Sequence, residues 1–250
     1  MKNKWLFYIG FFVLLITVFL VVVSRFMDFS KAPLLELSAV NEFSFVNQDG
    51  KMISDRDVEG KVYVAEYFFT TCPSICPRMN ANMRKVYDVY KSEPGFLILS
   101  HTCMPETDSV SRLKAYERKM LDGKLIQNLD GSFRIFYDSS KLPVPGWGMD
   151  TTKRHTNWQF LTGPKADLYK MARQSYIIDK NKTDSTEASK NQFLHTQFFA
   201  LVDKQRKVRG IYDGLNTAEV DKLLEDIRDL LKETLHRENF NSSTFSNNPN

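Results

Sequence analysis

The chain has few cysteines and histidines: its 250 residues include three cysteines and four histidines. A small secreted domain that depends on disulfides normally has more cysteines, in an even number. A chain of this length is also large enough to bury a stable core without such bridges. We therefore do not expect the cysteines to be present for stability.

The chain also lacks a continuous basic surface pattern and an internal repeat. Its formal net charge of +4 is spread over stretches of mixed sign. No cluster of Lys and Arg is interleaved with aromatic residues, so we do not expect nucleic acid among its partners. An Arg- and Ser-rich transit segment is absent from its start as well, which favours a bacterial over a mitochondrial protein.

One long apolar run is present, WLFYIGFFVLLITVFLVVV at residues 5–23, without a charged side chain. A helix of this length, rising about 1.5 Å per residue, spans most of a hydrocarbon core of about 30 Å. Lys2 and Lys4 precede it and favour a cytoplasmic N-terminus. The alternative is a cleaved signal peptide, but the run is longer than a usual signal core and no small-x-small pattern closes it. We expect an uncleaved, single-pass anchor in the bacterial cytoplasmic membrane, with the C-terminal domain on the periplasmic side.

The sequence predicts three parts. Residues 1–31 would form the cytoplasmic N-terminus, the transmembrane helix and a tether, and residues 32–237 the folded domain. Residues 238–250, rich in Asn and Ser, are expected to be a disordered tail.

Within the domain, buried-strand patterns and helical patterns alternate. An alternating run with an Asp-Gly turn predicts a hairpin over 43–53. Buried strands are expected at 61–70, 95–101 and 157–163. Each is followed by an expected helix, at 77–92, at 108–121 (with Asp108 as N-cap) and at 164–176. Two further strands, QFFALVD and KVRGIYDG, and a helix at 217–235 complete the domain. This order predicts an α/β domain with a thioredoxin-like fold. Residues 122–156 fit this plan least well and are expected to be an irregular excursion of unknown function.

Cys72 and Cys76 follow the first buried strand, at the entrance to a helix, in FFTTCPSICPRMN. The positive end of a helix dipole favours thiolate over thiol at such a position. Three residues separate the two cysteines, whereas thioredoxin-type oxidoreductases have two, which weakens a disulfide-exchange interpretation without excluding it. Two sulfurs are an incomplete metal site, and together with an imidazole they would suit copper or zinc.

Among the histidines, His195 is the strongest candidate for a third ligand. It lies in FLHTQFFALVD, before a buried strand whose start commonly faces the motif loop in this fold. His101 and His155 are weaker candidates, and His236 is expected to be solvated among charges.

Cys103 has two open interpretations. It could exchange disulfides with Cys72 or Cys76, or it could be a buried cysteine at a strand end. Met79 and Met104 are soft potential donors, although methionines are more often part of a core.

Three segments, FFTTCPSICPRMN, NWQFLTG and FLHTQFFALVD, resemble the Sco/SenC family of membrane-anchored copper proteins. The resemblance covers roughly residues 40–235, without most of 122–156. It implies a thioredoxin-like fold that binds one copper ion, Cu(I) or Cu(II), through Cys72, Cys76 and His195.

The same resemblance implies a copper chaperone that matures the copper A site of cytochrome c oxidase subunit II, by delivering copper, reducing the target's cysteines, or both. Subunit II or its assembly intermediates and other copper carriers are then the expected partners. The chain would be a metallochaperone rather than an enzyme. The alternatives are a membrane-tethered thiol–disulfide reductase and a redox or copper sensor.

The chain departs from the family pattern at two places. Ser74 stands where the family often has an acidic residue between the cysteines, and SHTCMPETDS stands where many members have an Asp-Pro stretch after the third strand. Cys103 is therefore not a ligand that the family implies.

Overall fold

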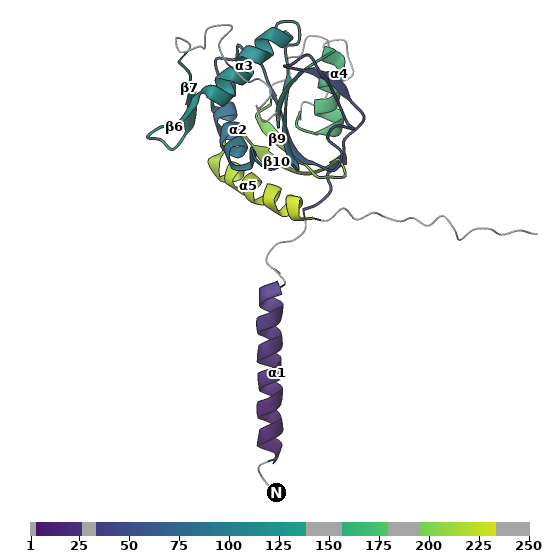
Figure 1. The fold of residues 1–250 in the computed structure, drawn as a ribbon, viewed down its shortest axis with the longest axis vertical. Helices are drawn as coiled ribbons and strands as arrows, with labels where there is room; N and C mark the ends of the chain where they lie inside the picture. Colours follow the sequence, from purple (N-terminus) through teal and green to yellow (C-terminus); the bar gives the residue numbers. More distant parts are fainter. Residues whose placement is uncertain (1–3, 27–33, 139–156, 180–195, 234–250) are drawn as a thin grey trace, which may run out of the picture. The chain divides into compact units, whose positions relative to one another are not determined.

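The computed structural model describes residues 4–26, 34–138, 157–179 and 196–233 (Figure 1). The chain divides into two compact units, Met1–Leu35 and Glu36–Asn250. The first unit contains helix α1 (Lys4–Phe26). Among the described residues, no helix combines the length and the apolar character that crossing a membrane requires. The transmembrane helix predicted for about 5–23 is therefore not confirmed.

The second unit is built on a mixed sheet in the order β1-β10-β9-β4-β5-β8-β2-β3. Its strands are β1 (Ser38–Ala39), β2 (Ser44–Asn47), β3 (Met52–Ser54), β4 (Val62–Phe68), β5 (Phe96–Thr102), β8 (Trp158–Thr162), β9 (Phe198–Val202) and β10 (Lys207–Asp213). β4, β5 and β8 run parallel, and β9 pairs antiparallel with β4. Parallel neighbours require crossover connections, which α2 and α3 supply. This arrangement confirms the predicted thioredoxin-like α/β fold.

Helices cover both faces of the sheet (Figure 1). One face carries α2 (Cys76–Tyr90), α3 (Val110–Asp122) and α5 (Thr217–Lys232), and the other carries α4 (Lys165–Lys170), continued by the π-helical turn η3 (Met171–Ser175). The helix α2 buries Met79, Met83, Val86 and Tyr90, three or four positions apart, on its sheet side. Pro77 lies in its first turn, where a missing N–H costs no helical hydrogen bond.

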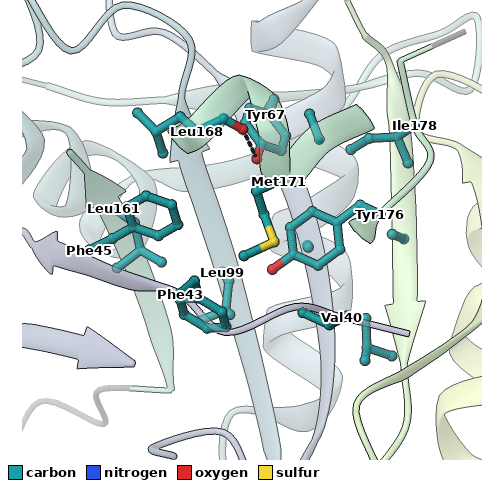
Figure 2. Close-up of a cluster of buried hydrophobic side chains, with 14 of the residues drawn as sticks. Val40, Phe43, Phe45, Tyr67, Leu99, Leu161, Leu168, Met171, Tyr176 and Ile178 are labelled. Carbon is teal, nitrogen blue, oxygen red and sulfur yellow. Dashed lines mark hydrogen bonds between the residues drawn. The ribbon is translucent and has the colours of Figure 1, made fainter. Parts of the chain in front are cut away.

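All seven residues of β4 are buried, as expected for a central strand covered on both faces. Tyr63, Ala65 and Tyr67 join the cluster that packs against α4 and η3. Figure 2 shows part of this cluster, with the Tyr67 hydroxyl donating to the carbonyl of Leu168 at 2.7 Å. Because side chains alternate along a strand, Glu66 and Phe68 point to the opposite face, toward α2 and α3.

The hairpin predicted around Asp49-Gly50 is confirmed as β2 and β3, with Gly50 at a φ of 73°. The irregular excursion predicted for 122–156 is wrong for its first part. Residues Lys124–Gln127 and Phe133–Phe136 form a second, two-stranded sheet, β6 and β7, that contacts α2. Asp130-Gly131 lies between these strands, with Gly131 at a φ of 80°, and this turn pair is the signal that could have predicted them. Residues 139–156 lie outside the described residues.

Two valines of α2 provide a test of the packing. Val86 is fully buried and Val89 is 55% exposed. We expect Val86→Ala to lower the free energy of unfolding by about 2 kcal/mol, because it removes buried methyl groups and leaves a cavity. Val89→Ala is the matched control and should change it by no more than about 0.5 kcal/mol. Both substitutions alter helix propensity equally, so their difference in urea denaturation isolates the contribution of burial. Equal effects would contradict the placement of α2.

Candidate functional site

The pairing of β4 with β5 brings the three cysteines to one edge of the sheet. The two strands are parallel and in register from Val62↔Phe96 to Phe68↔Thr102, so their carboxyl ends lie side by side. Cys72 lies in the turn after β4, where its amide donates to the Phe69 carbonyl at 3.2 Å. Cys76 is the first residue of α2. Cys103 follows β5, and its amide donates to the Phe68 carbonyl at 2.7 Å.

Cys72, Cys76 and Cys103 line one pocket of about 230 Å³, and all three are free thiols. Most of its other lining residues are aromatic or apolar, among them Tyr67, Phe68, Phe69, Pro73 and Ile75. Sulfur in apolar surroundings suits a soft metal ion or disulfide chemistry better than a hard, oxygen-bound cation. The structure therefore places Cys103 with the predicted pair.

The two motif cysteines differ in environment. Cys72 is half-buried, whereas Cys76 is 4% exposed. Burial raises the pKa of the Cys76 thiol, the neighbouring Cys72 raises it further, and a hydrogen bond from the Phe69 backbone opposes the rise. The expectation that the helix start favours a thiolate is therefore wrong for Cys76, because burial outweighs the helix dipole.

Asp108 ties the two cysteine-bearing segments together. This fully buried carboxylate accepts hydrogen bonds from the Thr70 amide at 3.1 Å, the Thr70 hydroxyl at 2.6 Å and the Thr102 hydroxyl at 2.6 Å. The predicted N-cap role of Asp108 is wrong. The residue before α3 is Ser109, without a capping side-chain hydrogen bond, and Asp108 instead joins the ends of β4 and β5.

Glu66 is a residue of the site region that the sequence reasoning missed. It is fully buried on the α2 face of β4, where its Oε1 accepts from the Ser100 hydroxyl at 2.6 Å. Its Oε2 has no hydrogen-bond partner among the described residues. Burial raises the pKa of Glu66 to about 8, and the Ser100 hydrogen bond opposes the rise. Its signal was a lone carboxylate inside the apolar run VYVAEYF.

The other candidate donors lie elsewhere. His101 is fully buried in β5, with its ring stacked on Tyr67 at 5.0 Å, and burial lowers its pKa to about 4. It is not among the residues that line the cysteine pocket. Met79 belongs to the core, and Met104 is a partly buried residue packed against the Figure 2 cluster.

His195, His155 and His236 lie outside the described residues. Within the described ranges, no group of three or more Cys, His, Asp or Glu side chains is arranged to hold a metal ion. The residue after His195 is described, however. Thr196 lines the cysteine pocket, and its hydroxyl donates to the Ile178 carbonyl at 2.8 Å. The chain therefore enters β9 beside the two motif cysteines.

A thioredoxin-like domain with a Cys-x-x-x-Cys motif at the start of its first crossover helix is the class that fold and site define. The SCO1/SenC family model matches residues 32–134 and 149–232. The chain belongs to the SCO1/SenC family.

The chain is similar to other proteins of this family. An SCO1 protein homolog of Bacillus subtilis (strain 168) is 27% identical over 191 residues, which cover 76% of this chain and 81% of the relative. The structure of BsSco, described as having a disulfide switch and as a member of the Sco family of cytochrome c oxidase assembly proteins, is 26% identical, with a TM-score of 0.54. The match covers 82% of this chain and 98% of BsSco.

A ScoI structure from Bradyrhizobium japonicum, with copper bound, has a TM-score of 0.50 at 16% identity. The match covers 78% of this chain and all (100%) of that chain. At this identity the similarity shows a shared fold alone.

The unusual state of Glu66 predicts a pH dependence of stability. Its folded-state pKa of about 8 is above its ordinary value of 4.5, so the folded protein retains a proton that the unfolded chain loses. The stabilisation from this proton is complete below pH 4.5 and is lost as the pH rises toward 8. Glu66→Gln should remove this contribution, and the Gln variant should gain stability relative to wild type by up to about 1.4 kcal/mol per pH unit across that window.

Urea denaturation between pH 6.5 and 8 measures the effect, since the opposite contribution of His101 lies below this interval. Glu225→Gln changes an exposed carboxyl in α5 and is the matched control, which should retain the wild-type pH dependence. A Glu66→Gln variant whose stability stays parallel to wild type would rule out a protonated Glu66.

Proposed function

We propose that the chain binds one copper ion through Cys72, Cys76 and His195 and supplies it to the copper A site of cytochrome c oxidase. The observation that carries the proposal is the placement of Thr196 in the pocket of the two cysteines. The peptide bond keeps residue 195 about 3.8 Å from Thr196, measured between Cα atoms. Membership of the SCO1/SenC family supports the choice of copper over zinc.

The donor set fits copper as cargo. Two thiolates and a neutral imidazole suit Cu(I), and an added oxygen or nitrogen ligand would accommodate Cu(II). Burial raises the pKa of the Cys76 thiol, so copper binding must displace a tightly held proton. The free energy of the metal–sulfur bond offsets the cost of losing this proton. An arrangement of this kind holds copper and still allows transfer to the thiolates of a partner, for which we propose subunit II of the oxidase, with other copper carriers as donors.

Copper titration of the purified full chain tests the ligand set. Wild type is expected to bind one copper per chain, measured by competition with a Cu(I) chelator. Cys72→Ser and Cys76→Ser should lose high-affinity binding, and His195→Ala should weaken it at least about 100-fold, or about 2.7 kcal/mol. His236→Ala is the matched histidine control and should bind as wild type does. A His195→Ala protein with wild-type affinity would refute this histidine as a ligand.

A second function, reduction of the oxidase subunit's cysteines, is favoured by one specific observation. Cys72 and Cys76 are free thiols and near enough for a side-chain hydrogen bond between them. The described disulfide switch of BsSco supports it. In a strain lacking the gene, rescue of oxidase activity by added copper would favour delivery, and rescue by a membrane-permeant reductant would favour reduction. A redox or copper sensor would leave oxidase assembly intact.

We also propose that the folded domain works outside the cytoplasm, at the bacterial cytoplasmic membrane. The support is the uncharged run at 5–23 with Lys2 and Lys4 before it. Protease added to spheroplasts is expected to digest the domain, while a cytoplasmic marker protein survives. Membranes washed in alkaline carbonate should retain the intact chain. Protection of the domain from the protease would overturn this location.

A further inference from the structure

We propose that Cys103 is a third redox-active thiol, which takes over the disulfide of an oxidised Cys72–Cys76 pair by bonding to Cys76 and releasing Cys72. The proposal rests on the shared pocket of the three cysteines and does not depend on copper. It adds a function to a residue that the family pattern leaves without one.

The geometry favours Cys76 over Cys72 as the partner of Cys103. Both Cys76 and Cys103 are deep in the pocket, at 4% and 3% exposure, whereas Cys72 is half-buried at its rim. Burial raises the pKa of the Cys103 thiol, and the neighbouring Cys76 and Cys72 raise it further.

The surroundings hold Cys103 in place while the motif cysteines have room to move. Its amide donates to the Phe68 carbonyl at 2.7 Å, and its carbonyl accepts from the Tyr169 hydroxyl at 3.0 Å. Cys72 precedes α2 and lies in a turn, and Cys76 is the first residue of that helix. The pocket of about 230 Å³ between these segments leaves space for a change of Cys76 rotamer.

The step is an internal thiol–disulfide exchange. The Cys103 sulfur, having given up its proton, attacks the Cys76 sulfur, and a Cys76–Cys103 bond forms as the Cys72–Cys76 bond breaks. The electron pair of the broken bond leaves with Cys72, which takes up a proton. One disulfide and one thiol are present before and after, so the exchange consumes no oxidant. The first disulfide comes from a thiol oxidant or from the disulfide of a partner protein.

This exchange would change what the site presents to a partner. The disulfide moves to the apolar interior, and Cys72 becomes a single thiol at the rim, where it can attack a disulfide of another chain. Cys76 is then unavailable as a metal ligand. Because burial keeps Cys103 protonated, we expect the exchange to take minutes to hours, as uncatalysed disulfide rearrangements do.

Disulfide mapping of the full chain tests the proposal. The reduced, metal-free protein is oxidised with one equivalent of diamide, sampled over minutes to hours, quenched in acid, alkylated and digested with trypsin. Cys72 and Cys76 share the tryptic peptide 62–78, and Cys103 lies in 92–112. We expect a covalent 62–78/92–112 pair that accumulates with time, with alkylated Cys72 and a bond between Cys76 and Cys103 in the fragment spectra.

Two variants test the roles of Cys72 and Cys103 in the exchange separately. Cys72→Ser should form the Cys76–Cys103 bond directly on oxidation, and Cys103→Ala should lower alkylation of Cys72 in the oxidised protein at least about tenfold. Oxidised wild type that contains only the bond within peptide 62–78, together with a Cys72→Ser protein that forms no linked pair, would overturn the proposal. A bond from Cys103 to Cys72 would overturn the assignment of Cys76.

The test is separate from that of the proposed function. His195→Ala should form the linked pair as wild type does, even where its copper affinity is lost. Conversely, absence of the linked pair leaves the copper stoichiometry of wild type unaffected.

Discussion

The parallel pairing of β4 with β5 is the constraint on which the site depends. Seven residue pairs in register bring the ends of two strands, far apart in sequence, to one edge of the sheet. The loop after β4 carries Cys72 and leads to Cys76 at the start of α2, and the first residue after β5 is Cys103. Antiparallel β9, on the other side of β4, begins at the same edge and brings Thr196 there. The backbone hydrogen bonds between the strands are therefore what bring the residues of the site to one edge of the sheet.

Two buried carboxyl groups near this edge, Asp108 and Glu66, have different effects on the stability of the domain. Asp108 accepts three hydrogen bonds from residues after β4 and in β5, so it fixes the two strand ends to each other. Glu66 is held by one hydrogen bond and keeps a proton at neutral pH because it is buried. Asp108 stabilises the geometry of the strand ends, and Glu66 makes the stability of the core beneath α2 fall as the pH rises from 4.5 toward 8.

Local patterns predicted most of the fold, and long-range contacts account for what they missed. The run KVYVAEYFFT identified a central strand because it is rich in β-branched and aromatic residues, without the polar alternation of a half-exposed strand. Asp108 was misread, because an aspartate before a helix is a common cap and only the tertiary structure supplies Thr70 and Thr102 as alternative donors. The hairpin of β6 and β7 was missed, although Asp130-Gly131 marks its turn as Asp49-Gly50 marks that of β2 and β3. The position of Cys103 in the pocket follows from the strand register, which no local pattern encodes. The location of His195 stays a prediction.

The antiparallel placement of β9 also bears on how this family can diverge. Thr196 is held by its hydrogen bond to Ile178 and by the strand that follows it, and not by the length of chain that precedes it. Insertions or deletions upstream of residue 195 therefore need not shift the entry into β9. A change of chain length between Ile178 and Thr196 is compatible with an unchanged distance between the strand entry and the cysteine pair.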